Sequence, residues 1–486
     1  MSSSFLPAWL AGDARAFLPR RFHDRVARAV AVEAAAARGI SRDVLAALLA
    51  QNSRLPASPA REQQLAALGC SGTVVVATSQ PVGLFLGPLA TLYGAATAIV
   101  NARALERETG HRCVPLVWLQ SEDDDLTKVD HTSLARSSGE QLTVQLAPAM
   151  RAAKPSALAH VPLGPGIADA HALVCAELMA YPHAGDHLGL LARAYFAEAT
   201  FSEAFAIALA EVFAEEGLVL LDPCDPSMAS AVAPVHTRAL AESVAIAAAL
   251  QEHTRSLQAA GFAAPAAPSD QHGAARLRPL VRDTLLPTAV CVLEPDELLR
   301  LAQLVPLYQR LGVSMPMPAP RALMRVLDAS ARATLDKLGL TADDIEGTSP
   351  HALLNKVAAA PRAAPLDTAA LESELLAAII PRLQEVGASM AARDASLKKA
   401  AARASDDVKE AITRLMGKYT RALAHGDEVS GDRIDRLRSS LSPAGVPQER
   451  AHGFAAYACR YGTRAFTRLV LDTVQPFSPA ILDLRP

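Results

Sequence analysis

The sequence predicts an α/β protein in which a core of parallel strands carries helical insertions and is followed by a helical C-terminal region. Two observations indicate the core: a strand, a helix and a second strand follow one another within residues 73–119, and short apolar runs of strand length recur later. A third observation indicates the C-terminal region, because long helical patterns without strand candidates begin at about residue 329. This alternation is typical of the α/β class.

The first part of the core is bounded by clear local signals. Residues 73–78 form a β-branched run, residues 79–88 a loop with glycine and proline, and residues 89–108 a helical pattern that Gly110 closes. Residues 113–119 then form a second apolar run. Because two parallel strands need a crossover of about this size, we expect them to pair in parallel with a right-handed connection.

Three further strands are expected, at residues 218–221, 288–293 and 313–317. Helices are predicted over residues 5–50, where apolar residues recur at three- and four-residue spacing, and over residues 296–311. The resulting segments are an N-terminal helical segment (1–60), the first part of the core (61–138), a helical connecting insertion (139–216), the second part of the core with a further helical insertion (217–330), and a C-terminal helical or coiled-coil region (331–486).

Residues 397–422 carry a heptad pattern. Apolar, tyrosine or alanine residues occupy positions 397, 401, 404, 408, 412, 415, 419 and 422, at spacings that alternate mostly between four and three. Such a seam favours the pairing of helices over a simple surface helix. Two interpretations remain open: a helical hairpin within one chain, and a coiled coil that joins two chains into a homodimer.

Composition argues against several classes of protein. The 486 residues carry a net charge of -3 with both signs interspersed, so no basic stripe is available for the phosphates of a nucleic acid. No stretch of about 18 strongly apolar residues lacks a charge or proline, and the N-terminus lacks the pattern of a secretory signal. We expect a cytoplasmic protein that binds neither nucleic acid nor membranes. The six cysteines are scattered without a CxxC pair, which argues against a disulfide framework or a thiolate zinc site.

Two loops that follow the first two strands could carry chemistry. The loop at residues 79–88 leads into a helix N-terminus, where free backbone N–H groups and the helix dipole favour a phosphate or carboxylate. It is neither GxGxxG nor a Walker loop, so a structural turn is the alternative. Four carboxylates at residues 122–125 follow the second strand, before Asp130 and His131. Because ligands bind at the carboxyl ends of parallel strands, these carboxylates could form a binding site. The alternative is an acidic loop that is exposed to solvent.

One histidine pattern has the spacing of a metal site. His183 and His187 are four residues apart with Asp186 beside them, which would place both imidazoles on one helix face. However, Pro182 and Gly185 disfavour a regular helix there, and the glutamate of HExxH is missing. No metal ligands are therefore assigned. No GxSxG elbow is present, so no Ser/His/Asp triad is assigned either.

The same loops carry a resemblance to a known family. Residues 79–88, with Gln80, Gly83 and Gly87, are similar to a family loop that usually reads Gly-Gln-Gln followed by the same glycines. Residues 114–125 with His131 are similar to a valine-proline strand that ends in EDHD and is followed by a histidine. Further similar stretches are 91–93, 278–288, Gln303, 316–321 and 448–450. In order along almost the whole chain, the sequence thus resembles BshC, the family that adds cysteine in bacillithiol biosynthesis.

The resemblance implies a Rossmann-like core related to class I nucleotidyltransferases, inserted connecting segments, and a coiled coil that mediates dimerisation. It also implies the last step of bacillithiol biosynthesis, in which the amine of glucosaminyl-malate forms an amide with the carboxyl of L-cysteine. Hydroxide is a poor leaving group, so the carboxyl must be activated. We expect a nucleotide (ATP or ADP) and magnesium as the cofactors.

The resemblance also implies roles for individual residues. His131 is the expected proton carrier, because histidine exchanges protons near neutral pH. Glu122 and Asp125 are the other expected catalytic residues, and with Asp123 they would bind the amine or a magnesium ion. The residues expected to bind substrate or nucleotide are Ser79, Gln80, Gly83, Gly87, Tyr93, Asp123, Gln303 and Arg321.

Four positions depart from the family pattern. Ser79 and Pro81 replace a glycine and a glutamine of the first loop. Gly94 stands where the family usually has a lysine, and Asp124 where it has the histidine of EDHD. Two alternatives therefore stand beside the ligase: a catalytically weakened paralogue that binds a nucleotide or precursor as a dimeric scaffold, and a nucleotidyltransferase acting on another acid, although no HxGH motif is present.

Overall fold

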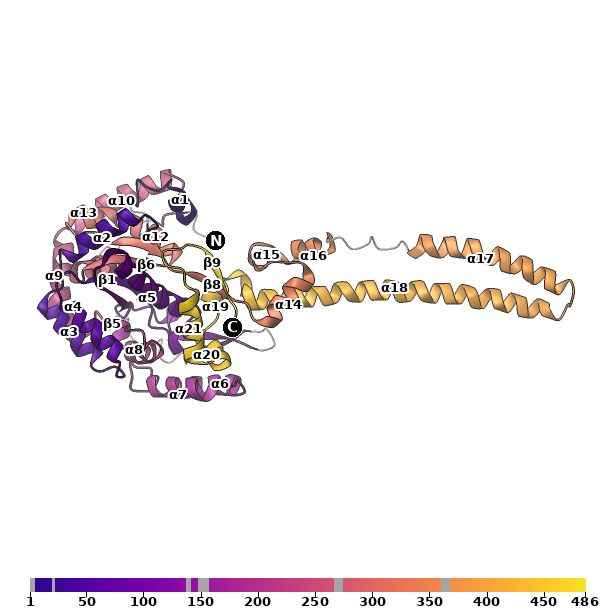
Figure 1. The fold of residues 1–486 in the computed structure, drawn as a ribbon, viewed down its shortest axis with the longest axis horizontal. Coiled ribbons are helices and arrows are strands. Elements are labelled where there is room, and N and C mark those ends of the chain that lie inside the picture. The colour runs from indigo at the N-terminus through magenta and orange to yellow at the C-terminus, as the bar shows by residue number, and fades with distance from the viewer. Residues whose placement is uncertain (1–4, 20–21, 137–140, 147–156, 266–273, 360–367) are drawn as a thin grey trace. The chain divides into compact units, whose positions relative to one another are not determined.

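The computed structural model describes residues 5–19, 22–136, 141–146, 157–265, 274–359 and 368–486. The chain divides into two compact units, whose elements are labelled in Figure 1. The first unit consists of Met1–Ala329 and Val446–Pro486, and the second of Ser330–Gly445. The second unit thus begins where the C-terminal helical region was expected to begin, but the last part of that region belongs to the first unit.

A five-stranded parallel sheet lies in the first unit, as predicted. Its order is β5-β2-β1-β6-β7, and every neighbouring pair is parallel. The chain adds strands on one side of β1 and then, from β6 onward, on the other, so the direction of winding reverses between β1 and β6. The strands are β1 (Val74–Gln80), β2 (Cys113–Leu119), β5 (Val219–Leu221), β6 (Thr288–Leu293) and β7 (Met317–Pro320).

The central strands are buried because helices pack against them. All residues of β2 and β6 are buried, which explains their continuous apolar runs. The crossover helix α5 (Leu89–Thr109) packs on β1 and β2 and ends, as predicted, at Gly110. Gly110 has a left-handed φ of 76°, and its N–H donates to Glu106 O.

The N-terminal segment is not the continuous helix that the periodicity of residues 5–50 suggests. Asp24 caps one helix by accepting from Val26 N and Ala27 N, and Ser41 caps the next by accepting from Val44 N. Apolar periodicity does not register such caps, and this is why the breaks were missed. The helices are α1 (Phe5–Ala11), α2 (Arg25–Ala36), α3 (Arg42–Asn52) and α4 (Pro59–Leu68).

The insertion after β2 begins with an antiparallel hairpin that the sequence analysis missed. Its strands are β3 (His131–Ala135) and β4 (Gln141–Gln145). The expected helix at residues 296–311 is two helices, because Pro306 lacks the N–H that would continue the first of them. The helices between β4 and β7 are α6 (Gly166–Leu178), α7 (Ala184–Ala194), α8 (Phe201–Val212), α9 (Ala229–Ala241), α10 (Ser243–Ala259), α11 (Ala274–Leu285), α12 (Pro295–Gln303) and α13 (Val305–Arg310).

The chain beyond residue 446 returns to the first unit. Its last strand, β9 (Ile481–Leu484), pairs in parallel with β8 (Leu323–Val326). The expectation that no strand follows residue 329 is therefore wrong. A four-residue strand leaves too short a pattern to recognise, and its partner lies far away in the sequence. The helices of this segment are α19 (Gln448–Ala451), α20 (Phe454–Tyr461) and α21 (Thr463–Thr473).

The second unit is helical throughout the part that the structure describes. Its two long helices pack against each other, so close that a Cβ on Gly387 would lie 2.7 Å from Ala401 Cβ. The heptad seam therefore belongs, at least in part, to a hairpin within one chain. No described helix is both long enough and apolar enough to cross a membrane. The helices are α14 (Ala329–Leu338), α15 (Ala342–Gly347), α16 (Pro350–Ala359), α17 (Thr368–Ala391) and α18 (Leu397–Leu441).

Candidate functional site

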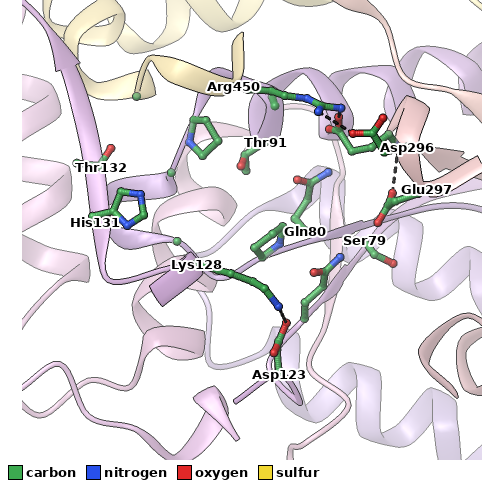
Figure 2. A pocket seen from close by; sticks show the side chains of 18 of the residues that line it. Ser79, Gln80, Thr91, Asp123, Lys128, His131, Thr132, Asp296, Glu297 and Arg450 are labelled. Carbon is green, nitrogen blue, oxygen red and sulfur yellow. Dashed lines mark hydrogen bonds and ion pairs between the residues drawn. The ribbon is translucent and has the colours of Figure 1, made fainter. Parts of the chain in front are cut away.

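A cavity of about 520 Å³ opens at the carboxyl ends of the central strands, beside the reversal between β1 and β6. Five parts of the chain line it: the end of β1 with the loop that leads into α5, the segment from the end of β2 to β3, Arg278 of α11, the start of α12 with Glu294 before it, and the segment around α19. Figure 2 shows their side chains around one space. Open parallel sheets bind their ligands at this position.

The loop after β1 has a backbone conformation that side-chain-bearing residues rarely adopt. Phe85, Leu86 and Gly87 have φ values of 51°, 70° and 64° in succession. A Cβ on Gly83 would lie 3.1 Å from Gly87 Cα, so the two glycines allow the ends of the loop to touch. Such strain costs on the order of 1–3 kcal/mol per residue and persists where surrounding contacts enforce it.

Tyr195 is one of these contacts. Its buried hydroxyl donates to Gly83 O at 3.0 Å and accepts from Leu86 N at 2.8 Å. Its ring packs edge-to-face on Phe85, with 5.1 Å between the ring centroids. Burial raises the pKa of the Tyr195 phenol above its ordinary value, so the group stays a protonated donor. One hydroxyl from the insertion thus holds two backbone groups of the cavity loop.

Replacing Tyr195 with phenylalanine is expected to lower the free energy of unfolding by about 1–3 kcal/mol, because Gly83 O and Leu86 N would be buried without a partner. Urea denaturation followed by tryptophan fluorescence measures this loss. Tyr181→Phe is the control, since it removes a phenol hydroxyl elsewhere and keeps the ring on which Arg460 lies. Equal losses in the two variants would contradict the role of Tyr195.

The segment around α19 closes the other side of the loop. Leu89 N at the start of α5 donates to His452 O at 2.9 Å, and Phe454 N donates to Gly87 O at 3.2 Å. A Cβ on Gly453 would lie 2.5 Å from Thr132 Oγ1, so only glycine fits. The N–H group of Leu89, one of those expected to bind an anion at this helix N-terminus, is therefore already bonded within the protein.

The acidic run after β2 is divided by its partners. Asp123 lines the cavity and accepts from Lys128 Nζ at 3.2 Å, while Asp125 lies 3.4 Å from the same nitrogen. His131 also lines the cavity, and its Nδ1 lies 3.1 Å from Asp130 Oδ1. Lys128 thus offsets the repulsion that consecutive carboxylates would otherwise experience.

Glu122 does not line the cavity and forms a buried ion pair with Arg278. Burial raises the pKa of the Glu122 carboxyl, and the Arg278 guanidinium acts in the opposite direction. Glu122 Oε2 and Arg278 Nη2 are both buried and have no hydrogen-bond partner among the described residues. Arg278 itself lines the cavity, so Glu122 can affect the cavity only through its ion pair with Arg278.

The start of α12 supplies a second charged wall. Arg450 from α19 lies 2.8 Å from Asp296 and 3.2 Å from Glu294. Burial, with Glu294 nearby, raises the pKa of the Glu297 carboxyl, which also caps α12 by accepting from Glu294 N at 3.0 Å. Arg300 lines the cavity and has no hydrogen-bond or ion-pair partner among the described residues.

The structure brings six of the predicted residues together in the cavity wall: Ser79, Gln80, Gly83, Gly87, Asp123 and His131. Five others lie outside the lining. Glu122 pairs with Arg278, Asp125 caps the turn at Thr127, and Tyr93 is fully buried. Gln303 donates to Thr254 Oγ1 and Pro265 O, and Arg321 is buried against Glu294 and Glu449.

The residues of the second wall were not among those predicted from the sequence. Glu294, Glu297 and Arg300 follow β6, a strand whose bounds were predicted correctly. The same rule that pointed to the ends of β1 and β2 would have pointed to these residues. Arg450 lies in the stretch 448–450 that resembles the family, but nothing local places Lys128 or Arg450 in the cavity, because their positions depend on the hairpin and on the returning C-terminal segment.

The histidine pair at residues 183–187 does not form a metal site in the described part of the chain, which contains no group of three or more potential metal-binding side chains. His187 is completely buried, with Nδ1 3.0 Å from Thr463 Oγ1 and its ring edge-to-face with Phe454. The side chain therefore packs helices together.

Burial of His187 predicts a pH dependence of stability. Its pKa is lowered from 6.5 to about 4 by burial. The imidazole of His187 binds a proton more tightly in the unfolded state than in the folded state. The free energy of unfolding is therefore unaffected by this group above pH 6.5, and it falls by about 1.4 kcal/mol per pH unit as the pH drops from 6.5 toward 4. Urea denaturation at several pH values between 6.5 and 4 measures the slope. His187→Gln should flatten it and His160→Gln should not; an unchanged slope in His187→Gln would exclude this origin.

The strand order, the reversal beside β1 and the cavity at that point define a Rossmann-like ligand-binding protein with an added helical hairpin. The chain belongs to the BshC family. The model of the bacillithiol biosynthesis BshC N-terminal Rossmann-like domain matches residues 14–273, and that of the BshC C-terminal coiled-coil domain matches residues 324–480. These matches confirm the resemblance and the predicted fold class.

Curated relatives match along most of their own length. A protein of Koribacter versatilis is 29% identical over 88% of this chain and 87% of its own. A protein of Salinibacter ruber is 26% identical over 96% and 90%, and one of Thermus thermophilus is 29% identical over 87% and 90%. All three are named "Putative cysteine ligase BshC".

Proposed function

We propose that this protein is a cysteine ligase that joins the carboxyl of L-cysteine to the amine of glucosaminyl-malate, the last step of bacillithiol biosynthesis. The name of its relatives supports this reaction. The observation that carries the proposal is the cavity beside β1 and β6, which combines Arg300, a cation without a partner in the described chain, with His131 and several carboxylates. Small molecules are the proposed substrates, and a cytoplasmic location without nucleic-acid binding belongs to the same proposal.

The charges of the cavity suit substrates that carry both signs. Cysteine and glucosaminyl-malate each bring an amine and at least one carboxylate. Lys128 and Arg300 offer cationic contacts, and Asp123 and Glu297 offer anionic ones. A site with separated charges orients such substrates, because each end of the molecule is attracted to a different wall.

ATP, with magnesium, is the proposed source of carboxyl activation, since it supplies a better leaving group than hydroxide. The lining fits a nucleotide in one respect: Arg300 has an unused guanidinium, a group that binds phosphate through two parallel hydrogen bonds. Magnesium is commonly held by one or two carboxylates together with phosphates. Asp123 and Glu297 are the carboxylates that would serve.

His131 is the proposed acceptor of the proton that the attacking amine loses. Asp130 Oδ1 lies 3.1 Å from His131 Nδ1, and Asp130 Oδ2 accepts from Gln145 Nε2 at 3.2 Å. These contacts orient the imidazole, as a carboxylate does in other histidine sites. Nε2 then remains available to the cavity, since no described residue bonds to it.

The proposal is tested by mass spectrometry after mixing the protein with glucosaminyl-malate, cysteine and ATP. The expected product is heavier than glucosaminyl-malate by one cysteine residue. His131→Gln should reduce its formation, and His160→Gln, at an exposed histidine outside the cavity, should not. Glu122→Ala is a poorer test because it leaves Arg278 buried without its partner. Absence of product from the unaltered protein, with a nucleotide still bound, would support the scaffold alternative, which the relatives do not favour.

We also propose that the second unit joins two chains into a homodimer. Large apolar side chains remain exposed on its long helices after α17 and α18 have packed together: Ile379, Val386, Met390, Leu397 and Leu415. Pairing with a second copy would remove them from water. Light scattering at micromolar concentration tests the assembly, and the mass of a single chain would overturn it.

A further inference from the structure

Gln80, the last residue of β1, has a side chain that is almost fully buried and yet lines the cavity. It is 5% exposed and lines the cavity, and its Nε2 donates to Thr78 Oγ1 at 3.2 Å. The carboxamide oxygen has no hydrogen-bond partner in the described chain. One end of the carboxamide is therefore fixed by the strand, and the other is available to a ligand.

Gly94 on α5 is what allows this position. A Cβ at residue 94 would lie 2.2 Å from Gln80 Nε2 and 3.3 Å from its Cδ. The next nearest atom is Thr78 Oγ1 at 3.5 Å, which is ordinary van der Waals contact. The carboxamide of Gln80 thus occupies the space that any side chain at position 94 would need, including the lysine that the family usually has there. Among the described residues, only atoms of Gln80 lie closer to that Cβ than ordinary van der Waals contact.

The carboxamide lies between the two charged walls of the cavity. In Figure 2, Gln80 and Thr91 lie between the Asp123–Lys128 pair and the group of Arg450 and Asp296. Neutral groups that both donate and accept hydrogen bonds, such as hydroxyls and carboxamides, match the hydroxyls of a sugar. Carboxylates and amines of a substrate would be attracted to the walls on either side.

We propose that Gln80 contacts an uncharged, hydroxyl-bearing part of the substrate, and that Gly94 is the positioning residue that keeps its carboxamide in place. The substrate contact rests on the proposed function, where this part is the sugar ring of glucosaminyl-malate. A side chain at position 94 drives the Gln80 carboxamide into the cavity. Residues 80 and 94 therefore act as one unit.

The pairing has a test that needs no substrate. Alanine normally stabilises the interior of a helix relative to glycine. In the unaltered protein Gly94→Ala should raise the thermal midpoint by less than this preference predicts, because its Cβ displaces the Gln80 carboxamide and breaks the hydrogen bond to Thr78. In the Gln80→Ala background no carboxamide has to move, and the same change should raise the midpoint by the larger amount. Equal shifts of the midpoint in the two backgrounds would overturn the pairing.

The substrate contact is tested by kinetics on the same variants. Gln80→Ala and Gly94→Ala should each raise KM for glucosaminyl-malate by about tenfold, the effect of one lost hydrogen bond, with a smaller change in kcat. The double variant should be no worse than Gln80→Ala alone. If the KM of the double variant rose by the product of the two single increases, the positioning role of Gly94 would be overturned. A wild-type protein without ligase activity would refute the proposed function and the sugar contact, while the thermal midpoints would still decide the pairing.

Discussion

Replacing Arg321 with methionine is expected to lower the free energy of unfolding of the first unit by about 3–5 kcal/mol. Arg321 is 1% exposed and pairs with Glu294 and, at 2.7 Å, with Glu449. Its Nη1 also donates to Ala322 O at 2.9 Å. Methionine would leave the buried Glu449 carboxylate without its cation, and the cost of an unpaired buried charge far exceeds the gain from an apolar side chain.

Tryptophan fluorescence during urea denaturation measures this loss, because both tryptophans of the chain, Trp9 and Trp118, are buried in the first unit. Arg464→Met is the matched control. Arg464 pairs with Glu215 at 3.4 Å with both side chains largely exposed, and such pairs contribute less than about 1 kcal/mol. A loss for Arg321→Met as small as that of the control would show that the buried network does not stabilise the fold.

Replacing Arg300 with methionine is expected to lower kcat/KM of the proposed ligase by about 100-fold. Arg300 is exposed to the cavity and has no partner in the described chain, so its removal should leave the fold intact. A hydrogen bond to a charged ligand is worth about 1.5–3 kcal/mol, and an arginine forms two at once with a phosphate or carboxylate. A lysine restores the charge but not the paired geometry, so Arg300→Lys should recover activity only in part.

Steady-state kinetics with each substrate varied in turn shows which one Arg300 holds, because only the KM of that substrate should rise strongly. Arg238→Met is the control, since Arg238 is an exposed arginine on α9 that neither lines this cavity nor has a partner among the described residues. Both variants should unfold at the urea concentration of the parent protein. Unchanged kinetics in Arg300→Met would remove Arg300 from the site.

Much of the sheet could be predicted because its signals are local. The bounds of β2 and β6 agree with the predicted runs at residues 113–119 and 288–293, where continuous apolar residues are bounded by breakers. The strand predicted at 313–317 is displaced, since β7 begins at Met317 and contains two prolines. β9 was missed because four residues carry no periodicity, and its pairing with β8 spans most of the C-terminal half of the chain.

The candidate site shows the same division. The rule that ligands bind at strand carboxyl ends pointed to Gln80, Asp123 and His131, and all three line one cavity in the structure. It could not separate Glu122 from Asp123, which are adjacent in sequence. One forms a buried pair with Arg278 from α11, and the other faces the cavity beside Lys128. Which of these two carboxylates lies at the cavity is decided by their ion-pair partners, and Arg278 lies far from Glu122 in the sequence.

The sequence alone determined the class of fold, the family resemblance and two of the loops at the cavity, because strand runs, helix ends and motifs are properties of neighbouring residues. Only the tertiary structure decided which charges remain unpaired. Arg300 is available to a ligand while Arg321 and Arg450 are neutralised by Glu294 and its neighbours. These arginines carry the same charge, which the sequence gives directly. They differ in burial and in ion-pair partners, which are set only when distant parts of the chain come together on folding.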